Sequence, residues 1–275
     1  MRAWSLVIAS SLLLAACGGG GPSPAGLAYA LPDPAAVTYV VGDTADMDID
    51  AGGESMQART TSSMTVETSF NRSDDGIEVW LGVQELDARQ TTPMGTLSAD
   101  GSGIDGPLVF SLDRQGNATV VSLPDVSGDA VQFFQPLAVA HSLFPGLPGR
   151  AASVGESWID TVRFEGEQSG GTVSSSTVLE YTLIGDTVVA DRSLVRLDFQ
   201  GTSEVTADGV IQGSDFSQSV SGNISGWILW DHQRNLLVEA HNQSDARGSM
   251  EISVSPYPVG LRVRQQGVVR LQEGG

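Results

Sequence analysis

The feature that most constrains the fold is a strict alternation of apolar and polar residues over long stretches. In residues 44–51, Ala45, Met47 and Ile49 lie on one face, and the aspartates lie on the other. Residues 259–271 alternate in the same way, with valines and leucines opposite arginines. A period of two places successive side chains on opposite faces of a strand, so both segments are predicted to be half-buried antiparallel strands.

Similar signals fill the rest of the chain after residue 37 and predict an all-β fold. Turn-forming residues separate the strands, and Asp208-Gly209 fits a type I′ hairpin tip. Several strands exceed the usual five or six residues, which favours a long curved antiparallel sheet or half-barrel. The further predicted strands are 56–71, 76–87, 107–113, 118–123, 157–168, 172–184, 193–206, 210–221, 226–231, 236–242 and 249–255.

One segment, residues 129–143, has the spacing of a helix. Pro136 interrupts it, so a short helix or two turns is expected. The Pro- and Gly-rich residues 144–149 that follow predict a rigid apolar loop.

Residues 128–150, called the hinge from here on, separate two halves of the chain that resemble each other. Val41-Gly42-Asp43-Thr44 returns as residues 154–157, and residues 113–117 return as residues 231–235 in the same order. The interpretation is two related β-meander units that form one structure, with chance similarity among turn-rich β chains as the alternative. The predicted units are 31–127 and 151–275, with the hinge at 128–150.

Composition excludes several function classes. The formal net charge is −19, and all 14 basic residues are arginine. Lysine-based covalent chemistry is therefore excluded, and the acidic balance disfavours a nucleic-acid partner.

The residues give no catalytic, cofactor or metal signature. Residues 46–54 resemble the start of a calcium loop, but Ala51 and Gln57 stand where that motif requires Gly and Glu, so a solvated strand face is the simpler interpretation. With a hairpin tip at 234–235, His241 is predicted to face Ile228 and to lie apart from His232, which disfavours a shared metal. No serine lies in a nucleophile motif, so we expect a non-enzyme without cofactors.

Aromatic residues are the candidate ligand contacts. Many gather in the second half of the chain, where they either form the core or line a cavity for an acyl chain or another apolar molecule. Phe133-Phe134 and Leu143-Phe144 flank the hinge and could gate such a cavity or plug it. The candidates are Trp158, Phe164, Tyr181, Phe199, Trp230 and Phe134.

The N-terminus carries an export signal. Arg2 precedes an apolar stretch, residues 4–16, that is too short to span a bilayer. The run Leu14-Ala15-Ala16-Cys17 resembles the lipobox of bacterial lipoproteins. The resemblance implies that residues 1–16 are a signal peptide and that Cys17, the sole cysteine, carries the lipid, with processing and sorting machinery as partners. The alternative is a secretory signal with an incidental cysteine.

The residues after the cysteine suit an anchor. Gly18–Gly21 begin a flexible tether over residues 17–30, and Gly18 in place of an aspartate favours the outer membrane. The resemblance therefore implies attachment to the outer membrane through an N-terminal lipid.

The folded part resembles lipoprotein carriers of the LolA/LolB/LppX type. The resemblance is carried by Gly155-Glu156-Ser157-Trp158, the Pro-rich hinge, and Ser225-Gly226-Trp227 followed by the Asp231 turn. It implies a curved sheet around an apolar concavity that short helices plug. It also implies a periplasm-facing domain that binds a lipid or another hydrophobic ligand.

The alternative function is a structural or protein-interaction lipoprotein with a filled core. Arg262, Arg264 and Arg270 share one strand face and would be its candidate contact surface. Cross-strand pairing of these arginines, with Glu251 as a partner, is the other explanation.

Overall fold

The structure is a computed structural model that describes residues 25–74, 76–168, 171–211, 213–255 and 257–272. The predicted signal peptide, Cys17 and residues 18–24 of the predicted tether lie outside these residues. The described chain forms one large antiparallel sheet of twelve strands with a single short α-helix, which confirms the predicted all-β class. No helix among the described residues is long and apolar enough to cross a membrane.

The elements follow one another in a long meander with small additions. They are β1 (Ala25–Leu27), β2 (Ala36–Ala51), β3 (Glu54–Ser73), β4 (Gly76–Thr92), β5 (Gly95–Asp100), η1 (Gly101–Gly103), β6 (Ile104–Asp105), β7 (Leu108–Leu112), β8 (Ala118–Ser122), β9 (Asp125–Val126), η2 (Gly128–Gln132), α1 (Pro136–Leu143), β10 (Arg150–Ala152), β11 (Ser157–Gln168), β12 (Gly171–Val189), β13 (Arg192–Ile211), β14 (Ser214–Asp231), β15 (Leu236–Ile252) and β16 (Val259–Gln272).

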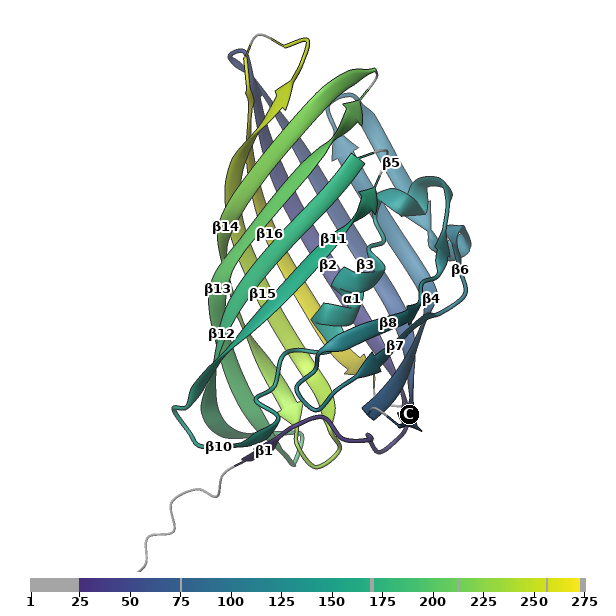
Figure 1. Ribbon diagram of the computed structural model, residues 1–275, viewed down its shortest axis with the longest axis vertical. Helices are drawn as coiled ribbons and strands as arrows, with labels where there is room; N and C mark the ends of the chain where they lie inside the picture. The colour runs from purple at the N-terminus through teal and green to yellow at the C-terminus, as the bar shows by residue number, and fades with distance from the viewer. Residues whose placement is uncertain (1–24, 75, 169–170, 212, 256, 273–275) are drawn as a thin grey trace, which may run out of the picture.

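The sheet curls strongly but stays open. Its order is β11-β12-β13-β14-β15-β16-β2-β3-β4-β7-β8, with β5 also paired to β4. The last strand, β16, pairs with β2, so the first and last strands of the large sheet meet in its middle. The two small sheets are β1-β10 and β6-β9. Figure 1 shows α1 in the opening between the β11 side and the β7–β8 side.

Glycines allow this curvature at close strand approaches. Gly226 in β14 pairs with Phe199 in β13, and the Phe199 ring lies so close that a β-carbon on Gly226 would be 2.5 Å from its Cζ. The same β-carbon would also collide with the backbone oxygen of His241 in β15. A glycine inside a strand permits such a tight bend, and an aromatic ring over it restores buried contact.

One predicted hairpin is wrong. Asp208 and Gly209 lie within β13, where they pair with Ser217 and Phe216 of β14, and the turn comes later, at Gly213 with φ +81°. Hydrogen-bonded neighbours on both sides, β12 and β14, extend the strand through a dipeptide that would form a turn in isolation.

A register shift also changes a predicted pairing. His241 faces Trp227, not Ile228, because the hairpin closes at the pair Asp231–Leu236 and not around a tip at 234–235, and a β-bulge between Leu229 and Trp230 then shifts the register by one residue. The extra residue moves the pairing beyond it by one position. The Trp227 and His241 rings consequently stack, with centroids 4.3 Å apart.

The helical segment divides as its proline predicts. η2 is followed by α1, and Pro136 occupies the first turn of α1, where its missing N–H costs no hydrogen bond. Val139, Ala140 and Leu143 of α1 are buried in the core. Phe144, just beyond the helix, packs edge-on against Phe110 at 5.4 Å. Phe144 is buried in the core and also lines the cavity described below, so its role as a gate or a plug stays a prediction.

The two halves share one turn but differ elsewhere. Asp113 accepts hydrogen bonds from the backbone of Gln115 and Asn117, and Asp231 accepts them from Gln233 and Arg234. The other matched pair differs, because residues 41–44 lie within β2 while residues 154–157 form the approach to β11. A repeat origin of the two halves therefore stays a prediction.

The convex face carries paired charges. Arg264 contacts Asp48 at 2.7 Å, and Arg59 contacts Asp46 at 3.5 Å, so both aspartates lie on a solvated strand face. The arginine stripe is also paired: Arg262 with Asp245, and Arg270 with Glu239. Cross-strand pairing thus explains the stripe, although its partners differ from Glu251.

Candidate ligand-binding site

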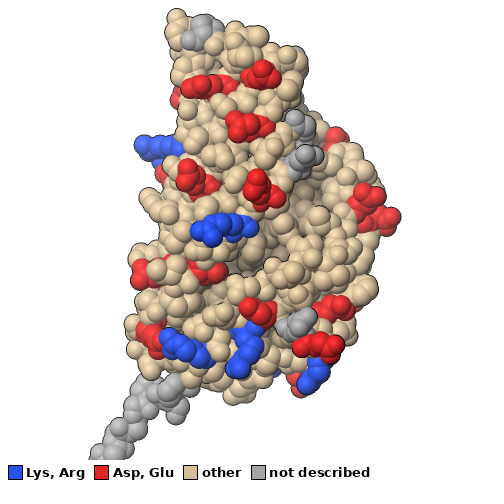
Figure 2. Space-filling view, viewed as in Figure 1, with Lys and Arg blue, Asp and Glu red and all other residues tan. Residues whose placement is uncertain are grey.

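A cavity of about 520 Å³ lies between α1 and the concave face of strands β11 to β16. It falls within the range of about 300–1,000 Å³ that is usual for small-molecule sites. The hollow in the surface is visible between the strands and the helical segment in Figure 2. Leu137, Ala138 and His141 line it from α1, while the opposite face of the same helix is buried in the core.

The wall is largely apolar because inward positions of successive strands face one another. Val162 and Phe164 come from β11, and Leu179 and Tyr181 from β12. The other apolar lining residues are Phe144, Pro145, Val173, Phe199, Val205, Ile224, Ile228, Ala240 and Val269.

Three of the six predicted contacts line this cavity: Phe164, Tyr181 and Phe199. They come from three neighbouring strands, and the Tyr181 and Phe199 rings lie 5.5 Å apart. Their contact with a ligand stays a prediction.

The other three predicted contacts are not among the residues that line the cavity. Trp158 stacks on Tyr181 at 5.8 Å and donates a hydrogen bond from Nε1 to the Gly146 oxygen at 3.0 Å. Trp230 is only 1% exposed and contacts Tyr29 edge-on, and Phe134 is also buried in the core. Side-chain size alone does not distinguish a core aromatic from a lining aromatic, so the sequence grouped them together.

Asp160 is the acidic lining residue, and the prediction missed it, as it missed the lining histidines His141 and His241. It shares the inward face of β11 with Trp158 and Val162, since all three are even-numbered on one strand. The alternation was therefore sufficient to detect a carboxyl group on an otherwise apolar face. Burial raises the pKa of Asp160, while the Thr161 backbone N–H and His141 partly oppose this rise.

His141 faces the same space from α1. Burial lowers the pKa of its imidazole, and the nearby Asp160 carboxylate opposes this shift. Burial also raises the pKa of Tyr181 and, more strongly, that of Tyr29. The cavity lining thus contains one carboxyl group, Asp160, beside His141, with a second imidazole, His241, on β15.

A fixed loop holds this part of the lining in place. Tyr29 donates a hydrogen bond to the Pro145 oxygen at 2.8 Å, and the Leu147 N–H donates one to the Gln115 oxygen at 2.8 Å. Gly146 packs directly against the Asp160 carboxyl group. These contacts tie residues 145–147 to β11 and to the 113–117 turn.

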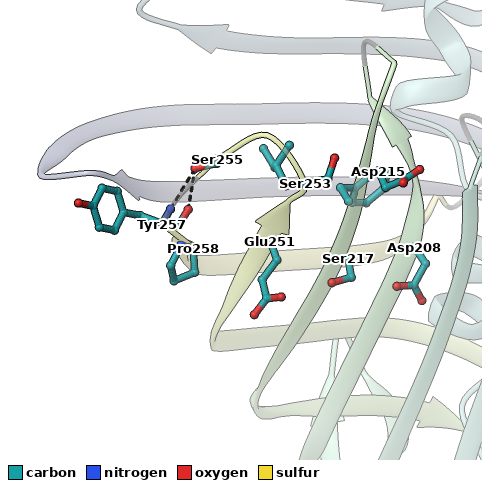
Figure 3. A pocket seen from close by; sticks show the side chains of 10 residues that line it. Asp208, Asp215, Ser217, Glu251, Ser253, Ser255, Tyr257 and Pro258 are labelled. Atoms are coloured by element: carbon teal, nitrogen blue, oxygen red, sulfur yellow. Dashed lines mark hydrogen bonds between the residues drawn. The ribbon is translucent and has the colours of Figure 1, made fainter.

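A second pocket, shown in Figure 3, lies where β13 ends, β14 begins and β15 ends. Asp208, Ser217 and Glu251 form a row across β13, β14 and β15, with the serine between the two carboxylates. Strands β13 and β15, which carry the two carboxylates, are therefore about 9–10 Å apart. Among the described residues, no group of three or more acidic, histidine or cysteine side chains is placed to hold a metal ion. We assign no chemistry to this exposed acidic surface.

Comparison with protein-family models gave no match, and comparison with curated proteins gave none either. Among solved structures, the chain is similar to Neisserial surface protein A, with 9% identity and a TM-score of 0.25 over 86% of this chain and 97% of that one. It is also similar to OpdO of Pseudomonas aeruginosa, with 8% identity and a TM-score of 0.18 over 87% and 97% of the two chains. These scores are too low to carry an argument about fold or function.

Proposed function

We propose that this chain is an outer-membrane-anchored lipoprotein whose β domain binds a lipid or another hydrophobic molecule without catalysing a reaction. The observation that carries the binding proposal is the apolar cavity beneath α1. An unfilled space of this kind beside a well-packed core is the expected form of a preformed small-molecule site.

The lipid anchor rests on the sequence pattern around Cys17. Ala25, the first described residue, begins β1 at the lower end of the sheet in Figure 1, where β1 pairs with β10. Seven residues lie between Cys17 and Ala25, which gives eight Cα-to-Cα steps, so a fully extended tether would reach about 26–29 Å. This length would hold the folded domain close to the membrane surface, with its paired charges in water.

Native mass spectrometry with organic extraction tests the binding proposal. The whole mature chain, purified from its host envelope, is expected to carry about one apolar molecule per chain. Ala138→Trp, which places an indole in the cavity from the exposed side of α1, should remove it. Val188→Trp, at a residue that is 71% exposed and outside the cavity lining, serves as the matched control and should retain it.

An empty wild-type cavity in a cooperatively folded protein would contradict the binding proposal. That outcome would favour the alternative of a structural or protein-interaction lipoprotein.

A further inference from the structure

We infer that the cavity selects its ligand by charge and takes an amphiphile with an ammonium head and an apolar chain. This inference rests on the proposed ligand-binding function and adds the chemical class of the ligand. Asp160, the aromatic row beside it, and the apolar wall beyond it each support one part of the assignment.

The charge of the lining disfavours anionic heads. Asp160 contributes a carboxyl group, whereas the described lining residues include no arginine and the chain has no lysine. A fatty acid carboxylate or a phosphate bound here would lose hydration and face Asp160, with only the imidazoles of His141 and His241 as cationic partners in the lining. Burying an unpaired charge is costly, so an anionic head is disfavoured.

The aromatic row beside Asp160 suits a cation. Tyr181 of β12 and Phe199 of β13 line the cavity as a cross-strand pair with ring centroids 5.5 Å apart, and Trp158 of β11, outside the lining, stacks on Tyr181 at 5.8 Å. Asp160 lies two residues beyond Trp158 on the same face. An ammonium group is attracted to aromatic faces and to a carboxylate, and these two features recur where proteins bind alkylated amines.

The rest of the wall suits an apolar chain. From Asp160, the inward positions of β11 continue through Val162 to Phe164, and Val205 of β13 and Ile224 of β14 extend this apolar wall across the sheet. An ammonium head near Asp160 would thus place its chain along this part of the wall.

Acid should weaken this binding. The groups that interact electrostatically with Asp160 are His141 on α1, Tyr181 on β12 and Tyr29. Both tyrosines have raised pKa values and stay neutral, so within this group Asp160 and His141 change charge as the pH falls. His241 also lines the cavity, from β15, where its ring hydrogen-bonds to Glu239. Protonation removes the negative charge from Asp160 and adds a positive one to His141, and both changes disfavour a bound cation.

Calorimetric titration of the mature chain with three probes of equal chain length tests the inference. The probes are dodecyltrimethylammonium, laurate and the uncharged monolaurin, each below its micelle-forming concentration. Dodecyltrimethylammonium is expected to bind about tenfold more tightly than laurate, which corresponds to about 1.4 kcal/mol. Asp160→Asn should remove this preference and leave monolaurin binding unchanged.

Asp208→Asn is the matched control, because Asp208 also lies on a long strand but is outside the cavity lining. It should leave all three affinities unchanged. Laurate binding at least as tight as that of the ammonium probe would overturn the charge assignment while the binding function stands. Failure of all three probes to bind would contradict both. An ammonium preference that survives in a folded Asp160→Asn protein would overturn the role of Asp160.

Discussion

The carboxyl group of Asp160 occupies the space in which a side chain at position 146 would lie. Asp160 belongs to β11, whereas Gly146 belongs to the loop after α1, and a β-carbon on Gly146 would collide with the carboxyl group. This contact joins the loop of residues 145–147 to β11, an edge strand of the sheet, and it sets the position of the single lining carboxylate.

Gly146→Ala is therefore expected to destabilise the protein by about 1–3 kcal/mol, because either the loop or Asp160 must move. Urea unfolding followed by circular dichroism measures the change in free energy. Gly26→Ala is the control, since a β-carbon there has no neighbour within 4 Å, and it should change stability by less than about 0.5 kcal/mol. Equal stabilities of the two variants would refute the close contact.

Asp160→Asn should make the protein more stable at pH 7. Burial raises the folded-state pKa of Asp160 above its ordinary 3.8, so the folded state holds its proton more tightly than the unfolded chain. The stability that this proton provides is complete below the unfolded pKa and is lost as the pH rises through the folded pKa. In thermal melts, the melting temperature of the wild type should fall relative to that of the Asp160→Asn variant as the pH rises from 3 to 7.

Asp100 provides the opposite case. Hydrogen bonds from the Ser102 side chain and backbone lower the pKa of Asp100, so its contribution is present above the unfolded pKa and is lost in acid. Asp100→Asn should therefore lower stability at neutral pH. If Asp160→Asn and Asp100→Asn changed stability at neutral pH in the same direction, the environment assigned to one of the two aspartates would be contradicted.

Gly226→Ala should destabilise the curved sheet by about 1–3 kcal/mol. The new methyl group would press on the His241 carbonyl and the Phe199 ring, and a backbone atom cannot rotate away. Gly42→Ala is the matched control in β2, where the nearest atom to an added β-carbon lies 4.0 Å away. Comparable losses in the two variants, measured by urea unfolding, would argue against a special role of Gly226 in the bend.

Trp230→Ala and Phe164→Ala should separate the core from the site. Trp230 is buried in the core, so its truncation is expected to cost about 3–5 kcal/mol of stability. Phe164 is half-buried on the cavity wall, so its truncation should cost less but weaken ligand binding. Calorimetric affinity per folded molecule would contradict this division if Trp230→Ala lost binding while Phe164→Ala retained it.

Cys17→Ser should abolish lipid attachment. Cells grown with an alkyne-tagged palmitate analogue are expected to label the wild-type chain and to leave the variant unlabelled, because the proposed acyl groups attach at Cys17 and its amino group. A wild-type chain without label would favour the secretory alternative, in which Cys17 is an incidental thiol.

The sequence by itself determined the all-β class and the division of the helical segment at Pro136. It did so because alternation and proline geometry act locally, between residues close in the chain. The same alternation also defined the faces of β2 and β16, whose outward charges pair across the strands.

Only the tertiary structure decided the pairing of β16 with β2, the bulge that moves His241 opposite Trp227, and the continuation of β13 through Asp208. It also decided which aromatic side chains line the cavity and which fill the core, and it brought Asp160 against Gly146. These outcomes depend on strand register and on packing between residues far apart in the chain. A local pattern specifies which face of a strand a side chain occupies. It does not specify whether that side chain packs against another element or lines a cavity.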